Sequence, residues 1–234
     1  MKNISFTLIL LTLCFNLFAQ KHLPGAMPAY LMCGTKGLFN TTLLVNQNIF
    51  DAGDEQIYKW SFGHSYGFML GYCFANSNAE IEIEYQFNTF TQNFSGWKSG
   101  ETYNSKIVLN TADIPVLFKV TTAYDGYFEI GPQFSFVRSA KYSSKPLITS
   151  GTVTKNFSSK TNVSGVLGMG TNFNLATNLL FLRIGIRFQF GITDLKGVDA
   201  LGQDLTDKVL YPKYRQTRFG SVGLLAGLIY YIKI

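Results

Sequence analysis

Hydrophobic and polar residues alternate strictly along the segment 178–193. From Leu180 onward the even positions are leucine, isoleucine or phenylalanine, whereas the odd positions include Arg183, Arg187 and glycines. A period of two predicts a β-strand with one apolar and one charged face. A transmembrane helix would scatter the arginines around its circumference, at about 2.5 to 3.5 kcal/mol for each charge at the bilayer centre. A strand of a soluble β-sandwich has the same alternation. The choice between a membrane barrel and a soluble sandwich therefore depends on how often the alternation recurs along the chain.

The alternation recurs throughout the chain and predicts about eight strands. These are 30–40, 62–74, 79–94, 106–121, 127–142, 161–175, 180–193 and 216–234. Short turns are predicted at 76–78, 124–126 and 176–178, and long loops at 41–61, 95–105, 143–160 and 194–215. Pro115 interrupts its segment and predicts a β-bulge there. We therefore predict an all-β fold, an eight-stranded antiparallel up-and-down transmembrane β-barrel with short periplasmic turns and long extracellular loops.

The composition favours a membrane environment. Only 15% of the residues are charged, where about a quarter is usual in soluble domains. The mean hydropathy is +0.11 although no internal run of about 20 apolar residues exists. The net charge of +6 comes with lysines spread over loop-like segments rather than clustered in one stripe, so nucleic acid is not an expected partner.

The first residues of the chain predict export. Lys2, an apolar stretch and Ala19 form the pattern of a signal peptide, residues 1–19, cleaved before a barrel domain at 20–234. The expected location is therefore the outer membrane. Cys33 and Cys73 fall on opposite faces of neighbouring predicted strands, which favours two free thiols over a disulfide. The spacing of cysteine and histidine predicts neither a metal site nor a cofactor.

Charged side chains occupy the face of the strands opposite to the apolar one. Lys36 of the first segment faces inward, and the predicted lumen network comprises Glu82, Glu84, Asp113, Lys119, Glu129, Arg183 and Arg187. The interior of a barrel of about eight strands is just filled by side chains, so we expect these charges to pair in a packed polar core. A proton or ion path along the same charges is the alternative, and it requires a gap between them.

Aromatic residues on the apolar face predict contact with lipid. The predicted lipid-facing or girdle residues are Phe74, Phe128, Tyr142, Phe188, Phe190 and Tyr230. Trp60, Trp97, Tyr211 and Tyr214 fall in predicted loops, where they either contact a partner or pack locally. The expected partners are outer-membrane lipid and lipopolysaccharide, together with envelope proteins reached through the loops or the periplasmic turns.

The sequence offers little for catalysis, and no catalytic residue is predicted. Outer-membrane barrels that modify lipid A need a serine with a histidine base nearby. Of the two histidines, His22 precedes the first strand and His64 lies in an apolar row. His64 with Ser61 or Ser65 is a conceivable dyad, but a histidine in an aromatic row is more often an interface anchor.

Two segments of the chain are ADIPVLFK at 112–119 and FEIGPQFSF at 128–136. They resemble the PorT-like outer-membrane beta-barrel family, and the similarity extends to GTKGLFN at Gly34, GVLGMGTNFNL at Gly165 and RIGIRFQFGITDL at Arg183. The resemblance implies an eight-stranded barrel in the outer membrane. One member of that family serves a protein secretion system linked to gliding motility. The motifs are short and mark the barrel rather than a particular function.

We therefore expect a non-enzymatic integral outer-membrane barrel with a plugged polar interior, which acts as a structural or interaction scaffold through its surface loops. One alternative is a component of a protein secretion or gliding motility apparatus. Another is a lipid A-modifying enzyme or a small-solute channel. The last is a soluble secreted barrel that binds an apolar ligand, which requires the apolar faces to point inward and the charged faces outward.

Overall fold

The computed structural model describes residues 28–98, 100–122, 124–145, 151–152, 161–176, 179–195 and 215–234. The described elements are almost all strands, with one short α-helix and one 3-10 turn. They are β1 (Tyr30–Asn46), α2 (Gln47–Asp51), η1 (Gly53–Glu55), β2 (Ile57–Lys59), β3 (Phe62–Cys73), β4 (Ala79–Lys98), β5 (Glu101–Thr121), β6 (Gly126–Lys145), β7 (Gly151–Thr152), β8 (Asn162–Ala176), β9 (Leu180–Gly191) and β10 (Thr217–Lys233). Within the described residues, no helix has the length and hydrophobicity needed to cross a bilayer.

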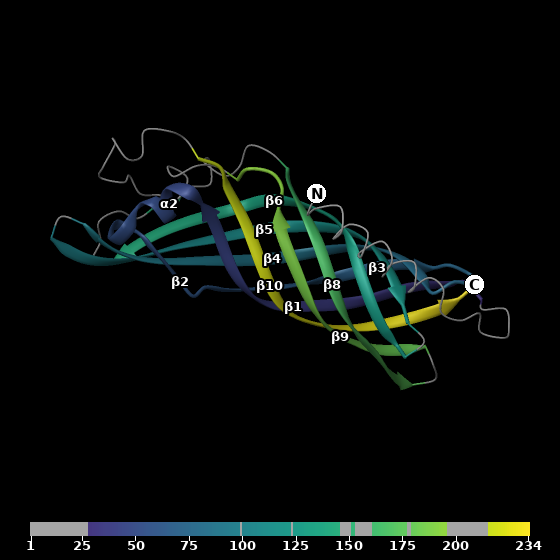
Figure 1. The fold of residues 1–234 in the computed structure, drawn as a ribbon. Helices are drawn as coiled ribbons and strands as arrows, with labels where there is room; N and C mark the ends of the chain where they lie inside the picture. Colours follow the sequence, from purple (N-terminus) through teal and green to yellow (C-terminus); the bar gives the residue numbers. More distant parts are fainter. Residues whose placement is uncertain are drawn as a thin grey trace, which may run out of the picture.

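Eight of these strands close into a ring (Figure 1). In the order β1, β3, β4, β5, β6, β8, β9 and β10, each pairs antiparallel with the next, and β10 pairs with β1. Because neighbours in the ring are also neighbours in the sequence, the fold is an up-and-down barrel. The short strands β2 and β7 pair with β4 and β6 beyond the ends of β3 and β8. The predicted fold class is confirmed.

The two ends of the barrel differ. At the short-turn end, Tyr30 of β1 pairs with Lys233 of β10, and the connections from β3 to β4, β5 to β6 and β8 to β9 span only a few residues. Asn76 and Asp125 have positive φ angles of 54° and 60° in two of these turns. Asparagine and aspartate tolerate this conformation better than other non-glycine residues. The turns predicted at 76–78 and 124–126 are therefore confirmed.

The opposite end, which we call the long-loop end, is more ordered than the sequence suggested. The loop predicted at 95–105 is wrong, because β4 and β5 continue as a hairpin until Lys98 pairs with Glu101. The loop predicted at 41–61 begins later, since β1 runs to Asn46 and is followed by α2, η1 and β2 (Figure 1). Most of 143–160 and 194–215 lies outside the described residues.

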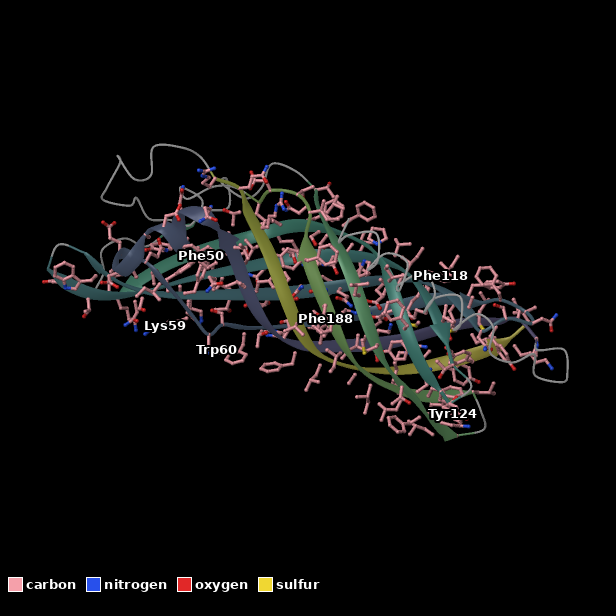
Figure 2. All side chains as sticks on the ribbon, viewed as in Figure 1. Phe50, Lys59, Trp60, Phe118, Tyr124 and Phe188 are labelled. Carbon is pink, nitrogen blue, oxygen red and sulfur yellow. The ribbon has the colours of Figure 1, made fainter. Side chains whose placement is uncertain are left out.

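Side chains along the membrane-facing part of the strands alternate between lumen and exterior. Ile184, Phe188 and Leu224 are 42%, 44% and 64% exposed, whereas Arg183 and Arg187 are fully buried. Figure 2 shows Phe118 and Phe188 among the side chains that project from this part of the strands. An apolar exterior around a charged interior is suited to lipid and excludes the soluble carrier, which needs the opposite arrangement.

The chemistry of the two faces reverses toward the long-loop end. On β4 the outward side chains are apolar as far as Phe87, and from Thr89 to Ser95 they are polar while Phe90 points inward. The reversal occurs at a row in which Thr89 Oγ1 donates to Asn110 Oδ1 at 3.0 Å and Asn110 Nδ2 donates to Ser139 Oγ at 2.8 Å. A polar exterior around an apolar interior is suited to water. We call these three residues the boundary row, because they mark where the strands leave the hydrocarbon.

A β-bulge lies beside the boundary row. The register of β5 against β6 shifts between Asn110 and Thr111, which leaves Arg138 of β6 without an opposite residue. One extra residue exchanges inward and outward positions along the rest of a strand. Tyr142, predicted to face lipid, is therefore only 4% exposed and packs in the apolar interior of the long-loop end.

The bulge predicted at Pro115 is wrong. Gln86 pairs with Asp113 and Ile83 pairs with Val116, so the register of β4 against β5 is the same on both sides of the proline. A proline removes one N–H donor without adding a residue, and the ladder can lose a hydrogen bond while keeping its register.

Candidate functional site

Eight charged side chains from five strands meet in the lumen between the short-turn end and the boundary row. They are Lys36 of β1, Glu80, Glu82 and Glu84 of β4, Lys119 of β5, Glu129 of β6, and Arg183 and Arg187 of β9. None is more than 4% exposed. Four are basic and four acidic, so their formal charges cancel. We call this group the lumen network.

Arg187 makes three hydrogen bonds to carboxylates, more than any other basic member of the network. Its Nη1 and Nη2 donate to the two carboxylate oxygens of Glu84 at 2.7 and 2.8 Å, and its Nε donates to Glu129 Oε1 at 2.7 Å. A two-pronged contact between guanidinium and carboxylate is the strongest and most directional ion pair available to side chains. These contacts join β9 to β4 through Glu84 and to β6 through Glu129.

The other basic side chains complete a continuous chain of contacts. Arg183 pairs with Glu80 and Glu82 at 3.1 Å each, and Lys119 pairs with Glu82 and Glu129 at 2.9 Å each. Lys36 pairs with Glu82 and lies 2.7 Å from Glu84. Every acidic member therefore contacts at least one basic member, as burial of charge demands.

Small and aromatic residues make room for these long side chains and fill the space between them. The Tyr127 ring has Lys119 Nζ at 5.4 Å and the Arg183 guanidinium at 4.9 Å from its centroid, within the range of a cation–π contact. Gly227 lies beside Lys36, and a Cβ there would come within 2.8 Å of Lys36 Cγ. The lumen at this level is packed rather than open.

The structure places six of the seven predicted lumen residues in the network, and Asp113 outside it. Asp113 faces the lumen one layer closer to the boundary row, where it accepts hydrogen bonds from Asn88 Nδ2 at 2.9 Å and Gln133 Nε2 at 3.1 Å. The expectation that it pairs with an opposite charge is wrong for the described residues, because amide and hydroxyl groups surround it. Lys36 and Glu80 belong to the network but were not among the seven. The same alternation that selected Glu82 placed both on the lumen side.

An apolar cluster closes the lumen beyond the boundary row. It contains Leu44, Ile49, Phe90, Phe94, Ile107, Leu109, Ala140, Tyr142, Leu195 and Phe219. Tyr58 of β2 packs against it, donates from Oη to the carbonyl of Leu44 at 2.8 Å and accepts from the N–H of Asn46 at 3.0 Å. Burial raises the pKa of Tyr58 to about 12. An apolar core, like that of a water-soluble protein, thus lies beyond the layer that contains Asp113, on the side away from the lumen network.

The remaining predicted lipid-facing residues lie on the exterior or at its edges. Phe188, Phe190 and Tyr230 are 44%, 50% and 45% exposed, and Phe74 and Phe128 are half-buried. Cys33 faces outward and Cys73 faces the lumen, where it packs against a small cluster that contains Met32, and both thiols are free.

The residues considered for a catalytic dyad do not come together. His64 and Ser65 lie on opposite faces of β3, with His64 outside and Ser65 in the lumen 3.4 Å from Gln86 Oε1. The Ser61 hydroxyl donates to the carbonyl of Lys59 at 2.8 Å. Among the residues that the structure describes, no group of three or more His, Cys, Asp or Glu side chains is arranged to hold a metal ion.

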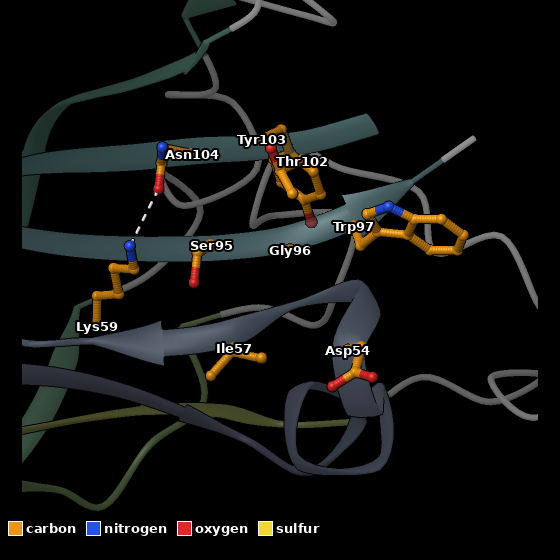
Figure 3. A pocket seen from close by; sticks show the side chains of 9 residues that line it. All are labelled: Asp54, Ile57, Lys59, Ser95, Gly96, Trp97, Thr102, Tyr103 and Asn104. Carbon is orange, nitrogen blue, oxygen red and sulfur yellow. Dashed lines mark hydrogen bonds between the residues drawn. The ribbon is translucent and has the colours of Figure 1, made fainter. Parts of the chain in front are cut away.

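The long-loop end carries exposed aromatic side chains and a groove. Trp60 and Trp97 are 83% and 55% exposed, whereas Tyr211, Tyr214 and His22 lie outside the described residues. A groove of about 570 Å³ lies between the segment 54–59 and the extended β4–β5 hairpin. Figure 3 shows its lining residues, with Trp97 at one end and Lys59 at the other. Lys59 Nζ donates to Asn104 Oδ1 at 3.2 Å.

Comparison with known families agrees with this geometry. A family model described as "Outer membrane protein beta-barrel domain" matches residues 18–197, which is most of the chain. The chain belongs to this outer-membrane β-barrel family. The protein is accordingly an integral protein of the outer membrane, and the short-turn end of this barrel faces the periplasm while the long-loop end faces outward.

Solved structures of small outer-membrane barrels are similar to the chain at low sequence identity. Neisserial surface protein A is 14% identical with a TM-score of 0.41, and the alignment covers 88% of this chain and 98% of that one. Ail of Yersinia pestis, in complex with the heparin analogue sucrose octasulfate, is 12% identical with a TM-score of 0.40, covering 86% and 99%. OprG of Pseudomonas aeruginosa is 11% identical with a TM-score of 0.37, covering 89% and 97%. No curated protein sequence matches the chain.

Proposed function

We propose that this protein is a closed outer-membrane barrel that acts as a scaffold. The part between the periplasmic turns and the boundary row is a filled anchor, and the part beyond it presents an interaction surface. The observation that carries the proposal is the lumen network, in which eight charged side chains of balanced sign are at most 4% exposed.

The network opposes conduction because an ion that crosses it has to separate buried pairs. Breaking one buried ion pair costs about 3 to 5 kcal/mol, since it leaves an uncompensated charge in a low-dielectric interior. The apolar cluster that contains Phe90 and Phe94 adds a second barrier beyond the network. These two layers support a plugged interior over a small-solute channel.

Single-channel recording tests the closed interior. The purified full-length protein is refolded, its insertion is verified by heat-modifiable migration in a detergent gel, and it is added to planar bilayers. We expect no steady conductance. A steady conductance of nanosiemens order in a sample that passes the folding check contradicts the proposal.

The interaction role is supported by the shape of the long-loop end. β4 and β5 continue to the tip at Lys98 and Glu101, well beyond the boundary row, and give exposed Trp60 and Trp97 a rigid support. Exposed aromatic residues on a rigid base are typical of protein contact sites. Photo-cross-linkers at Trp60 and Trp97 in intact cells should capture an envelope or extracellular partner. Cross-linkers at Asn76 and Asp125 of the periplasmic turns are the matched comparison.

The second candidate, a component of a protein secretion or gliding motility apparatus, is supported by the PorT-like segments 112–119 and 128–136. They lie on the paired strands β5 and β6 and contain Pro115 and Pro132. An apparatus on the periplasmic side predicts cross-links from Asn76 and Asp125 and co-purification with other envelope proteins. Cross-links confined to the tryptophans favour the surface scaffold.

We do not propose lipid A modification, because His64 and Ser65 face different environments on the two sides of β3. Mass spectrometry of lipid A from cells with and without the gene tests this choice. A change in acylation that requires His64 would contradict it.

A further inference from the structure

Basic side chains gather on the outer face of the barrel at and just beyond the boundary row. We call the following five residues the basic patch: Lys59, Lys106, Arg138, Lys141 and Lys145, all of them exposed. The register brings them together. Lys59 pairs with Asn93, Asn93 with Lys106, and Lys106 with Ser143, which stands between Lys141 and Lys145 on β6. The patch therefore spans β2, β4, β5 and β6.

The charges of the patch are uncompensated within the described residues. None of the five forms an ion pair with another described residue. Arg138 lies over the ring of Phe87 at 5.5 Å, and Lys59 donates to Asn104. The outward positions between the cations carry amides and hydroxyls such as Asn93, which can donate further hydrogen bonds.

The depth of the patch matches the lipid headgroups of the outer leaflet. Below the boundary row, the outward side chains on the same strands are apolar, Phe87 on β4 and Phe136 on β6 among them. Lys106 lies four residues beyond Asn110 on β5, which is about 10 Å further along the barrel axis for a tilted strand. Figure 2 shows Lys59 and Trp60 toward the end that carries α2, and Phe118 and Tyr124 toward the other end. Arg138 lies over Phe87 at the edge of the apolar band, and the lysines further out are placed to reach phosphate groups of the headgroup layer.

We propose that the basic patch binds the phosphate groups of lipopolysaccharide in the outer leaflet. The occupant follows from location and charge. The outer leaflet holds an anionic glycolipid whose phosphates lie above its acyl chains, and the patch offers five cations that begin with Arg138 at the boundary row and extend outward from the apolar wall. This inference depends on the outer-membrane location of the barrel and not on the scaffold role proposed above.

Binding of purified lipid A to the full-length protein in zwitterionic detergent micelles tests the proposal. The test variant combines Lys106→Gln, Lys141→Gln and Lys145→Gln. The control variant loses the same charge elsewhere, through Arg215→Gln, Arg218→Gln and Lys233→Gln, all at exposed positions outside the patch. A surface cation contributes about a fivefold change in affinity for anionic lipid, so three should weaken binding on the order of 100-fold. The control variant should stay within about fivefold of the wild type.

Three further arms make the outcome specific. Dephosphorylated lipid A should bind the wild type and the test variant equally, and a set of arginine replacements at the same three lysines should retain tight binding. Inorganic phosphate at 10 mM should leave bound lipid A in place. The proposal is overturned if the test variant binds like the wild type, if the control variant loses as much, or if inorganic phosphate displaces the lipid completely. Heat-modifiable migration verifies folding, and single substitutions replace any triple variant that fails to fold.

Discussion

Removal of Arg187 should strongly destabilise the barrel. Arg187→Met deletes three charge-assisted hydrogen bonds, two to Glu84 and one to Glu129, at 2.7 to 2.8 Å. Glu84 keeps Lys36 and Glu129 keeps Lys119, but the network then holds four carboxylates against three cations. Breaking a buried pair in this way costs about 3 to 5 kcal/mol, because the freed carboxylates stay buried.

The loss is measurable by urea unfolding of the barrel in lipid vesicles, followed by the fluorescence of Trp60 and Trp97 and by heat-modifiable migration. With a slope of about 2 kcal/mol per molar urea, the midpoint should fall by about 2 M. Arg218→Met is the matched control. This arginine is exposed on β10, where its loss should change the free energy of unfolding by no more than about 0.5 kcal/mol.

A double variant separates buried charge from simple loss of packing. Arg187→Met combined with Glu84→Gln restores the balance at three charges of each sign. It should be at least about 1.5 kcal/mol more stable than the sum of the two single losses predicts, because directly contacting groups couple. A single loss below about 1 kcal/mol, or strict additivity in the double variant, would show that the pairs do not stabilise the lumen in the way argued here.

Three other predictions concern the region beyond the boundary row. Burial raises the pKa of Tyr58 to about 12 against about 10 in an unfolded chain, so the folded state holds this proton more tightly. The contribution of Tyr58 to the free energy of unfolding is complete below pH 10 and is lost as the pH rises toward 12. Between pH 10 and 12 the free energy of unfolding should therefore decrease less in Tyr58→Phe than in the wild type. Phe94→Ala should cost about 3 to 5 kcal/mol in the same urea assay, since Phe94 is fully buried in the apolar cluster, and a cost under 1 kcal/mol would mean that the cluster is not a core. With both native tryptophans replaced by phenylalanine, a tryptophan at Phe190 should be quenched by brominated lipid and one at Tyr142 should not, whereas equal quenching would contradict the inward orientation of Tyr142.

The membrane-embedded half of the barrel could be predicted from sequence because one rule governs all of it. Lipid outside and charge inside impose a period of two, so the alternation around Arg183 or Glu82 fixes both the strand and its orientation. The short turns added local signals, such as Asp125 before Gly126. What the alternation could not supply was the identity of the partners. Asp113 has the same pattern as Glu82 but meets amides, because pairing depends on which residues the register brings to the same height.

The extent of the strands at the long-loop end was predicted wrongly. Outward positions are apolar where the strands contact lipid and mostly polar where they contact water, so a single alternation does not continue to the ends of the strands. In the segment 79–98 the apolar positions are odd up to Phe87 and even at Phe90 and Phe94, and beyond Phe94 neither pattern continues, which predicts a loop from residue 95. The strand in fact continues, and only the medium around it differs. The helix α2 was missed for a similar reason, since its five residues are too few for a helical period to show.

On β6 the change from lipid to water coincides with one inserted residue, Arg138. Deletion of Arg138 tests whether this residue is needed for the orientation of the side chains beyond it. Beyond the bulge, Ala140 and Tyr142 point into the apolar cluster while Lys141 and Lys145 point outward. Val137 and Ser139 already pair with Thr111 and Asn110, so deletion of Arg138 joins two residues that are in register and makes the ladder regular, with Tyr142 still inward and both lysines still outward. The deletion should therefore change the free energy of unfolding by no more than about 1 kcal/mol, and it should weaken lipid A binding by only the roughly fivefold expected for one lost cation. Arg138→Ala keeps the extra residue and loses the same charge, so it is the control and should bind lipid A equally well. If the protein lacking Arg138 binds lipid A as weakly as the triple lysine variant, the outward position of the lysines depends on the inserted residue.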